Sequence, residues 1–204
     1  MEAIMIKAVF FDFGGVIADE GWEKGLRDIA GEQGFEPEQF FADACDVLWG
    51  TGYMYGRATE DEFWTKFGER YDFKMTVDEM RQIIFDRFKI RPEVIELIKK
   101  IGKTDYRLAI LSDQVNWLDE FNEKYGFYDL FEKVYNSYYL GKGKKDRTVF
   151  PEVCADFGVK PDEVLFVDDN AGHIERAKNE GLQIVHFVDY IRNIKDIEVI
   201  LCLS

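Results

Sequence analysis

Apolar, strand-like runs in this sequence end at polar side chains that could do chemistry. Asp12 follows the run of residues 8–11, and Gly14 and Gly15 come soon after it. An ionised carboxylate is too costly to bury unpaired, so Asp12 should lie at the rim of a core. Glycines there let the backbone approach a phosphate or a metal closely. Taken alone, the same segment could be an ordinary strand end with a tight turn.

Two further strand tips and one loop carry a hydroxyl, a cation and more carboxylates. They are Ser112 and Asp113 after residues 106–111, Lys144 within the glycine-bracketed residues 141–145, and Asp168 with Asp169 after residues 164–167. Parallel strands would bring all of these tips to one edge of a sheet. The pattern therefore predicts one site that holds a candidate carboxylate nucleophile, a hydroxyl, a lysine and a pair of carboxylates.

Each of these residues also has a simpler explanation when it is considered alone. Ser112 could cap the next helix, and Lys144 could be a solvated loop lysine. Asp168 and Asp169 could cap the helix that follows, where its dipole favours negative charge. The common order of the four segments favours the shared site.

The four segments resemble the motifs of the haloacid dehalogenase superfamily, and the resemblance covers almost the whole chain. Asp12 and Val16 match the first motif, and Ser112 matches the second. Lys144 matches the third motif, and Asp168 with Asp169 match the fourth. Gly14 departs from the family, whose first motif usually has a second Asp there. Asp113, Lys145 and His173 also differ from the common residues, which are Asn, Pro, and Asp or Asn.

The resemblance implies a magnesium-dependent phosphohydrolase that cleaves a small phosphate monoester, with sugar phosphates among the candidates. Asp12 would attack phosphorus and form an aspartyl phosphate, assisted by Lys144. Ser112, Asp113 and Lys144 would bind the phosphate group. Mg²⁺ would be held by the Asp12 side chain, the Gly14 carbonyl and Asp169, with Asp168 beside them.

Gly14 raises a chemical question, because a glycine cannot protonate the leaving oxygen or activate water. General acid and base catalysis contributes roughly a hundredfold to ten-thousandfold. Another acid or a water molecule could substitute, the leaving group could need little protonation, or turnover could be slow. His173 is one candidate substitute, whereas His186, inside an apolar run, is expected to be structural.

Two other functions fit parts of the pattern. A haloacid dehalogenase also lacks the second Asp, but its chemistry needs no metal and has no use for the pair Asp168 and Asp169. A non-catalytic regulator that binds phosphate or metal would need the same residues and could have lost turnover through Gly14. A mutase or phosphotransferase fits the pattern less well, because such an enzyme normally needs an acid and a base at the substrate hydroxyls.

The composition describes a globular chain of 204 residues that is 47% hydrophobic and 32% charged, with a net charge of −14. Nucleic acid and anionic membranes are disfavoured as partners, because both require a basic face. The expected partner is a small phosphorylated molecule. Cys45, Cys154 and Cys202 are expected to be buried, inert thiols. With neither a secretory signal nor a long apolar run, the expected location is the cytoplasm.

The expected fold is α/β, with a doubly wound, Rossmann-like parallel sheet and an inserted helical cap. Residues 1–18 and 90–204 should form the catalytic core, and residues 19–89 the cap. Helical periodicity is expected at 22–33, 37–49, 60–71 and 77–88, with capping boxes at Thr59 with Glu62 and at Thr76 with Glu79. After residue 91, helices at 92–100, 116–125, 147–157, 171–180 and 190–201 should alternate with strands at 106–111, 133–136, 164–167 and 183–187. Most cap aromatics, Trp22, Trp49, Tyr53, Tyr55 and Trp64, should form the cap core rather than line a pocket.

Overall fold

A computed structural model of the chain describes residues 5–203 and contains a five-stranded parallel sheet. The strands are β1 (Ala8–Phe11), β2 (Arg107–Ser112), β3 (Lys133–Asn136), β4 (Val164–Asp168) and β5 (Gln183–His186). Their order is β3-β2-β1-β4-β5, and all neighbouring strands are parallel. The direction of winding reverses at β1, so the topological switch point lies between β1 and β4. The predicted doubly wound fold is confirmed.

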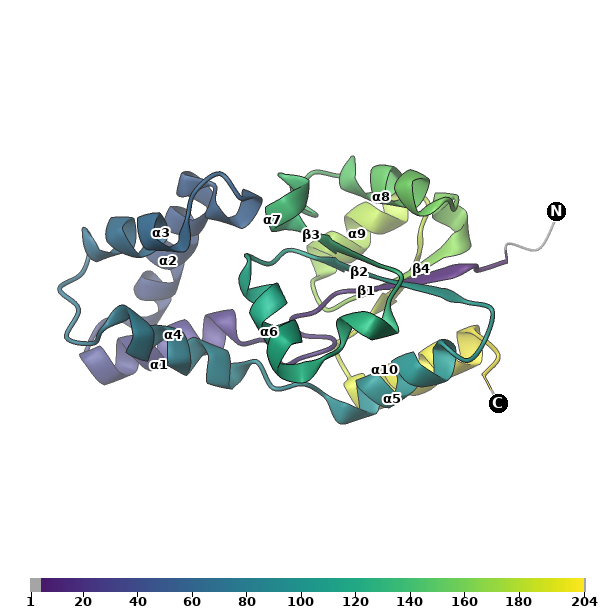
Figure 1. Cartoon of the computed structure of the whole chain (residues 1–204), viewed down its shortest axis with the longest axis horizontal. Helices are drawn as coiled ribbons and strands as arrows, with labels where there is room; N and C mark the ends of the chain where they lie inside the picture. Colours follow the sequence, from purple (N-terminus) through teal and green to yellow (C-terminus); the bar gives the residue numbers. More distant parts are fainter. Residues whose placement is uncertain (1–4, 204) are drawn as a thin grey trace.

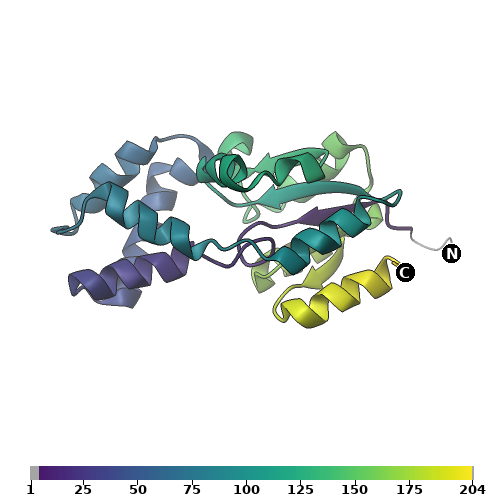
Figure 2. The ribbon, with the colours of Figure 1, turned by 60° about the horizontal axis from the view of Figure 1, so that its bottom comes forward.

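Helices cover both faces of the sheet, which explains why its strands are apolar throughout (Figures 1 and 2). Successive side chains of a strand point to opposite faces. Val9 and Phe11 share one buried cluster with residues of α5 (Pro92–Ile101), α6 (Trp117–Tyr125) and α10 (Tyr190–Ile200). Phe10 lies in the second cluster, with residues of α8 (Val149–Phe157) and α9 (Ala171–Asn179). The sheet is therefore a rigid platform for the residues at its tips.

Four helices between β1 and β2 lie beyond the carboxyl ends of the strands (Figure 1). We refer to them as the helical insert: α1 (Trp22–Gln33), α2 (Pro37–Thr51), α3 (Glu60–Gly68) and α4 (Val77–Arg87). The segments that enter and leave the insert pair with each other. The Asp19 N–H donates to the Lys89 carbonyl at 2.9 Å, and the Arg91 N–H donates to the Ile17 carbonyl at 2.9 Å. This pairing fixes where the insert meets the sheet edge.

The expected helices and strands are all present, with ends that differ by a few residues. Both predicted capping boxes form, at Thr59 and at Thr76. The helix expected at 60–71 ends at Gly68, and the short helix α7 (Ser137–Leu140) was not predicted. The division into a core of 1–18 and 90–204 and a cap of 19–89 stays a prediction, and its residues 1–4 and 204 lie outside the described residues.

The cysteines are free thiols in three different environments. Cys154 is buried, as expected, and Cys45 is partly buried. Cys202 is exposed, so its predicted burial was wrong: it lies in the turn after α10, where Leu201 and Leu203, rather than Cys202, pack against the core. Between residues 5 and 203, the structure has no helix with the length and apolar character needed to cross a membrane.

Candidate active site

Asp12 extends β1 by one residue and stands at the switch point. Its N–H donates to the Val167 carbonyl of β4 at 2.9 Å, so the backbone is still held by the sheet. Its Oδ1 accepts a hydrogen bond from the Phe13 N–H at 2.7 Å. Its Oδ2 lies 2.6 Å from the Lys144 Nζ. The residue is only 7% exposed, so a buried cation neutralises a buried carboxylate.

Lys144 is completely buried and bridges two carboxylates. Its Nζ lies 2.6 Å from Asp12 Oδ2 and 2.7 Å from Asp168 Oδ2. Its backbone N–H donates to Asp113 Oδ1 at 2.9 Å, and its carbonyl accepts from Arg176 Nε at 2.8 Å. The alternative of a solvated loop lysine was wrong, because the loop after α7 turns this side chain inward beneath the strand tips.

Gly143 allows the lysine loop to approach the tip of β2. A Cβ at this position would lie 2.7 Å from Asp113 Oδ1, which is closer than real contacts permit. Asp113 therefore contacts the main chain of the loop and holds Lys144 in place. The phosphate-binding role of Asp113 expected from the sequence stays a prediction.

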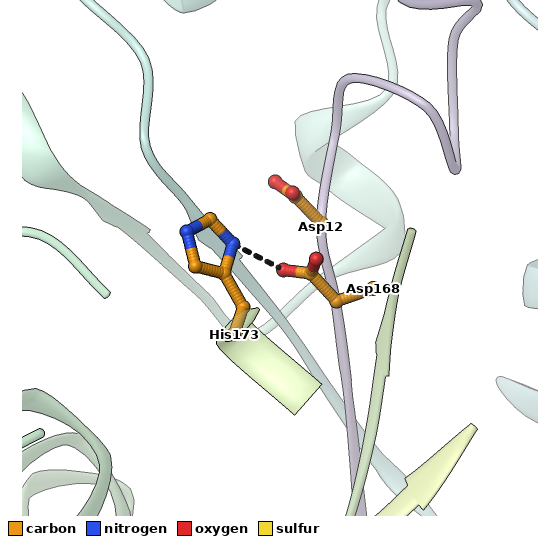
Figure 3. Close-up of side chains that lie close together, drawn as sticks. All are labelled: Asp12, Asp168 and His173. Carbon is orange, nitrogen blue, oxygen red and sulfur yellow. Dashed lines mark hydrogen bonds and ion pairs between the residues drawn. The ribbon is translucent and has the colours of Figure 1, made fainter. Parts of the chain in front are cut away.

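Asp168 and His173 complete the group around Asp12, as Figure 3 shows. Asp168 ends β4 with no exposed surface, and its Oδ2 lies 3.2 Å from His173 Nδ1. Ligand atoms of Asp12, Asp168 and His173 all lie within 4.8 Å of one another. The other oxygen of Asp168 accepts from the Asn170 N–H at 2.7 Å. His173, on the first turn of α9, is thus drawn into the charged network rather than exposed.

Asp169 lies directly against the turn that follows Asp12. Gly15 has a φ of +75°, and a Cβ there would be 2.0 Å from Asp169 Oδ2, so only glycine fits. The Asp169 carbonyl contacts His186 Nε2 at 2.9 Å, which gives His186 the structural role expected for it. Asn170, not either acid, caps α9 through the Gly172 and His173 N–H groups. The alternative explanation of the acids as helix caps was therefore wrong.

Ser112 is the last residue of β2 and is 2% exposed. It does not cap the following helix, because the residue at that position is Asn116, whose side chain makes no capping hydrogen bond. Ser112 lies close enough to Asp12 to lower the pKa of that carboxyl, against the larger effect of burial. The structure thus places Ser112 beside Asp12, as its position in the sequence suggested.

Burial and charge act against each other at the centre of the site. Burial raises the pKa of Asp12, although the neighbouring Lys144 opposes this effect. Burial alone would also raise the pKa of Asp168, but Lys144 and His173 hold it well below its ordinary value. Burial would lower the pKa of Lys144, yet the two carboxylates raise it. Lys144 therefore remains a cation, and Asp168 remains its ionised partner.

A pocket of about 290 Å³ opens between the strand tips and the helical insert. Of the sequence-predicted site residues, Asp12, Gly14, Asp113 and Asp169 line it, whereas Ser112, Lys144 and Asp168 are buried behind its wall. A larger cavity of about 750 Å³ lies at the opposite edge of the sheet, beside Lys7 and Arg107, and contains none of the residues at the strand tips.

Sequence reasoning missed much of the pocket wall. The missed residues are Glu20, Glu23, Leu48, Met54, Phe88, Gln114, Val115 and Asn170. Most of them lie on the insert or its linkers, where no motif marks them. Among the cap aromatics, Trp22 lines the pocket, whereas Tyr53 and Trp64 are buried in the core cluster as expected.

The oxygen donors that face the pocket suit a hard divalent cation. Asp12, Gly14 and Asp169 line the same cavity, and Mg²⁺ prefers oxygen ligands such as carboxylates and main-chain carbonyls. Burial raises the pKa of Asp169, and the neighbouring Asp168 raises it further, so a cation would offset an unfavourable charge. Asp168 already has Lys144 as its cation and is better suited to support the site from behind.

Comparisons with known proteins identify the family of the chain. The family model of the haloacid dehalogenase-like hydrolases matches residues 6–181. The chain is 30% identical over 196 residues to the D-ribitol-5-phosphate phosphatase of Bacteroides thetaiotaomicron, covering 88% of this chain and 90% of that protein.

Solved structures show the same fold. A HAD family enzyme from Bacteroides thetaiotaomicron, in complex with magnesium and inorganic phosphate, superposes with a TM-score of 0.69 at 23% identity, covering 88% of this chain and 93% of the other. L-2-haloacid dehalogenase from Xanthobacter autotrophicus superposes with a TM-score of 0.64 at 19% identity, covering 88% and 76%. The motifs, the sheet and the family match lead to one conclusion: the chain belongs to the haloacid dehalogenase-like hydrolases.

Proposed function

We propose that the chain is a magnesium-dependent phosphohydrolase that cleaves small phosphate monoesters, with sugar and polyol phosphates as the preferred class. The similarity to a D-ribitol-5-phosphate phosphatase supports this class. The pocket of about 290 Å³ supports a small substrate, since ligand pockets generally span roughly 300–1,000 Å³. The expected partner remains a small phosphorylated molecule.

Asp12 is the proposed nucleophile. Its carboxylate attacks phosphorus, the leaving oxygen departs, and water then hydrolyses the aspartyl phosphate. Lys144, 2.6 Å from Asp12 Oδ2, offsets the repulsion between the carboxylate and the phosphate dianion. Ser112 would donate a hydrogen bond to a phosphoryl oxygen. Mg²⁺, held by Asp12, the Gly14 carbonyl and Asp169, would supply further charge neutralisation when bound.

One observation carries this proposal: a carboxylate at the switch point shares a buried lysine with a second carboxylate, beside a pocket rimmed by oxygen donors. Burying Lys144 between Asp12 and Asp168 costs desolvation energy that apolar packing would not require. Such an arrangement is typical of a site built for an anion that must meet a carboxylate nucleophile.

The test is hydrolysis of p-nitrophenyl phosphate with and without magnesium. We expect turnover that requires the metal and is lost in Asp12→Asn, which retains the shape of the side chain but not its charge. Asp105→Asn, an exposed change at the far edge of the sheet, is the matched control and should behave like the wild type. Metal-independent turnover, or full activity in Asp12→Asn, would refute the proposal.

The dehalogenase and regulator alternatives predict different outcomes. Release of chloride from 2-chloropropionate in the presence of a chelator would identify a dehalogenase, and Gly14 is the residue that favours this reading. Inactivity toward a broad panel of phosphate esters, with magnesium and phosphate still bound, would identify a regulator. Asp169, which lines the pocket together with Asp12, favours the phosphatase over the dehalogenase, whose chemistry has no use for this carboxylate.

A further inference from the structure

The candidate active-site pocket has two chemically distinct ends. At the strand tips, Asp12, Gly14 and Asp169 provide the oxygen donors of the proposed metal and phosphate site. At the other end, Glu20 and Glu23, from the linker and first turn of α1, form part of the wall. The leaving group of a bound phosphate ester must occupy this second end, because the first is taken by phosphate.

Glu20 is held in a fixed position by the start of α1. The Glu23 N–H donates to Glu20 Oε1 at 3.0 Å, and the Lys24 N–H approaches Oε2 at 3.4 Å. A helix N-terminus favours a negative charge, although partial burial raises the pKa of Glu20. Each oxygen retains a further lone pair that can accept a hydrogen bond from a substrate hydroxyl.

The pocket wall offers little positive charge to balance these glutamates. The described residues that line the pocket include no lysine or arginine, and His173 lies at the strand-tip end beside Asp168. Lys144 is buried behind the wall between two carboxylates. Glu23 forms an ion pair with Arg27, but Arg27 is not part of the wall.

Apolar surface accompanies the carboxylates at the same end. Trp22 lies between Glu20 and Glu23 in the sequence, and Met54 and Leu48 of the insert face the same cavity. An aromatic ring can cover the C–H groups of a carbohydrate while carboxylates accept from its hydroxyls. This combination is complementary to a polyol and unfavourable for a second anion.

We propose that Glu20, assisted by Glu23, selects phosphate esters whose leaving group is an uncharged polyol or sugar and rejects esters that carry a second anionic group. The inference rests on the proposed phosphatase function and assigns its specificity to these two residues. Phosphorylated sugar acids and bisphosphates are disfavoured because like charges brought together across an interface repel each other.

The experiment compares D-ribitol 5-phosphate with D-ribonate 5-phosphate, which differ in that a carboxylate replaces one terminal CH₂OH. Both are measured, at mildly alkaline pH with magnesium, as substrates and as competitive inhibitors of p-nitrophenyl phosphate hydrolysis. We expect the wild type to favour the polyol at least about tenfold in kcat/KM, or in inhibition constant. The variant Glu20→Gln should reduce this preference by at least about threefold, and Glu23→Gln should reduce it less, since Arg27 already pairs with that carboxylate.

The glutamine variants isolate charge, because the amide oxygen of Gln can still accept from the Glu23 N–H and preserve the start of α1. Glu32→Gln removes the same charge from an exposed position of the same helix and should leave the ratio unchanged. Equal treatment of the two compounds by the wild type, or an unchanged ratio in Glu20→Gln, overturns the inference while magnesium-dependent turnover stands. Absence of all phosphate-ester hydrolysis overturns the proposed function itself, and this inference with it.

Discussion

Lys144 is the residue whose surroundings show most directly that the strand tips form one site. Isolated lysines are rarely fully buried, and this one is accompanied by Asp12 and Asp168 at ion-pair distance. Asp113 holds its backbone, and Arg176 holds its carbonyl. The lysine therefore has a fixed position before any substrate arrives, which is the property that electrostatic catalysis requires.

We expect Lys144→Met to destabilise the fold as well as abolish phosphatase activity. Removing one partner of a buried ion pair costs about 3–5 kcal/mol, because the other charge is left buried and unpaired. The loss should be largest near neutral pH and should shrink as the pH falls, since burial raises the pKa of Asp168 once Lys144 is gone and the carboxyl can then take up a proton. Urea unfolding at several pH values measures it.

Lys142→Met is the control for this variant, because Lys142 lies in the same loop but is partly exposed. It should change the free energy of unfolding by less than about 1 kcal/mol. A Lys144→Met protein as stable as the wild type at neutral pH would show that Asp168 is neutral in the native state.

Gly14 can be replaced by the acid that most relatives are expected to have. Its φ is not positive, and a Cβ there would lie 3.7 Å from Phe88 Cε1, which is ordinary contact. We expect Gly14→Asp to fold and to raise kcat for alkyl phosphates, whose leaving oxygen needs a proton, by up to about a hundredfold. Activity toward p-nitrophenyl phosphate should change much less, because nitrophenolate leaves without a proton.

Gly14→Asn is the matched control, since it has the same shape and cannot donate a carboxylic proton. Equal stimulation by Asn and Asp would attribute the effect to shape. An unchanged rate for alkyl phosphates in Gly14→Asp would mean that another group of the site already protonates the leaving oxygen.

The sequence identified the strand-tip residues because they follow apolar runs and occur in a recognisable order. It did not reveal that Lys144 would be wholly buried, since nothing in a glycine-bracketed cationic loop shows whether its side chains turn inward. Glu20 was missed for a different reason: its contribution depends on how the linker places it opposite the strand tips, and no spacing rule relates the two.

At the scale of helices and strands, local sequence signals predicted where most helices begin but not where all of them end. The side chains of Thr59 and Thr76 each accept a hydrogen bond from the backbone N–H three residues later. In return, the side chains of Glu62 and Glu79 accept from the backbone N–H of these two threonines. These contacts are short-range and readable from sequence. The end of α3 could not be read from the sequence in this way, because Tyr71 lies outside the helix and donates a hydrogen bond to Asp43 at 2.6 Å.

We expect Thr59→Ala and Thr76→Ala each to lower the free energy of unfolding by about 1 kcal/mol, the usual cost of losing an N-cap. The hydrogen bond from the Thr59 backbone lowers the pKa of Glu62. The stability that Glu62 contributes is therefore fully present above the ordinary pKa of a glutamate and is lost as the pH falls through the lowered pKa. Thr65→Ala, exposed within α3, is the control and should be neutral or slightly stabilising. Urea midpoints that do not separate Thr59→Ala from Thr65→Ala would contradict the assignment.

At the scale of the whole molecule, the insert and the sheet are joined by several contacts besides the paired linkers. Glu60 of α3 accepts from Trp117 Nε1 of α6 at 2.9 Å, and Tyr53 donates to Asn116 at 2.6 Å. Lys145, next to the buried lysine, lies 4.1 Å from the ring centre of Trp49. The sequence predicted a helical insert, but these contacts depend on the relative placement of two segments far apart in the chain and could not be predicted from either.

The net charge of −14 acts on the whole approach path of an anionic substrate. The cations at the site are few, and Lys144 is fully buried, so a phosphate ester is repelled until it reaches the metal. Raising the ionic strength from about 0.01 M to about 0.15 M shortens the screening length from about 30 Å to about 8 Å. We therefore expect kcat/KM for a phosphate monoester to rise about two- to fivefold over this range, with free magnesium held constant.

The sign of this salt effect tests whether the acidic surface or the cations at the site dominate the electrostatic field that the substrate meets. The measurement uses a salt whose anion does not compete with phosphate, and kcat is followed separately to show that the change is in substrate capture. Glu20→Gln should weaken the response only slightly, because it removes one charge out of a net fourteen. A kcat/KM that falls as salt is added would show that local cations, rather than the acidic surface, govern the approach of the substrate. The path to the strand tips would then have to be positively charged despite the overall composition.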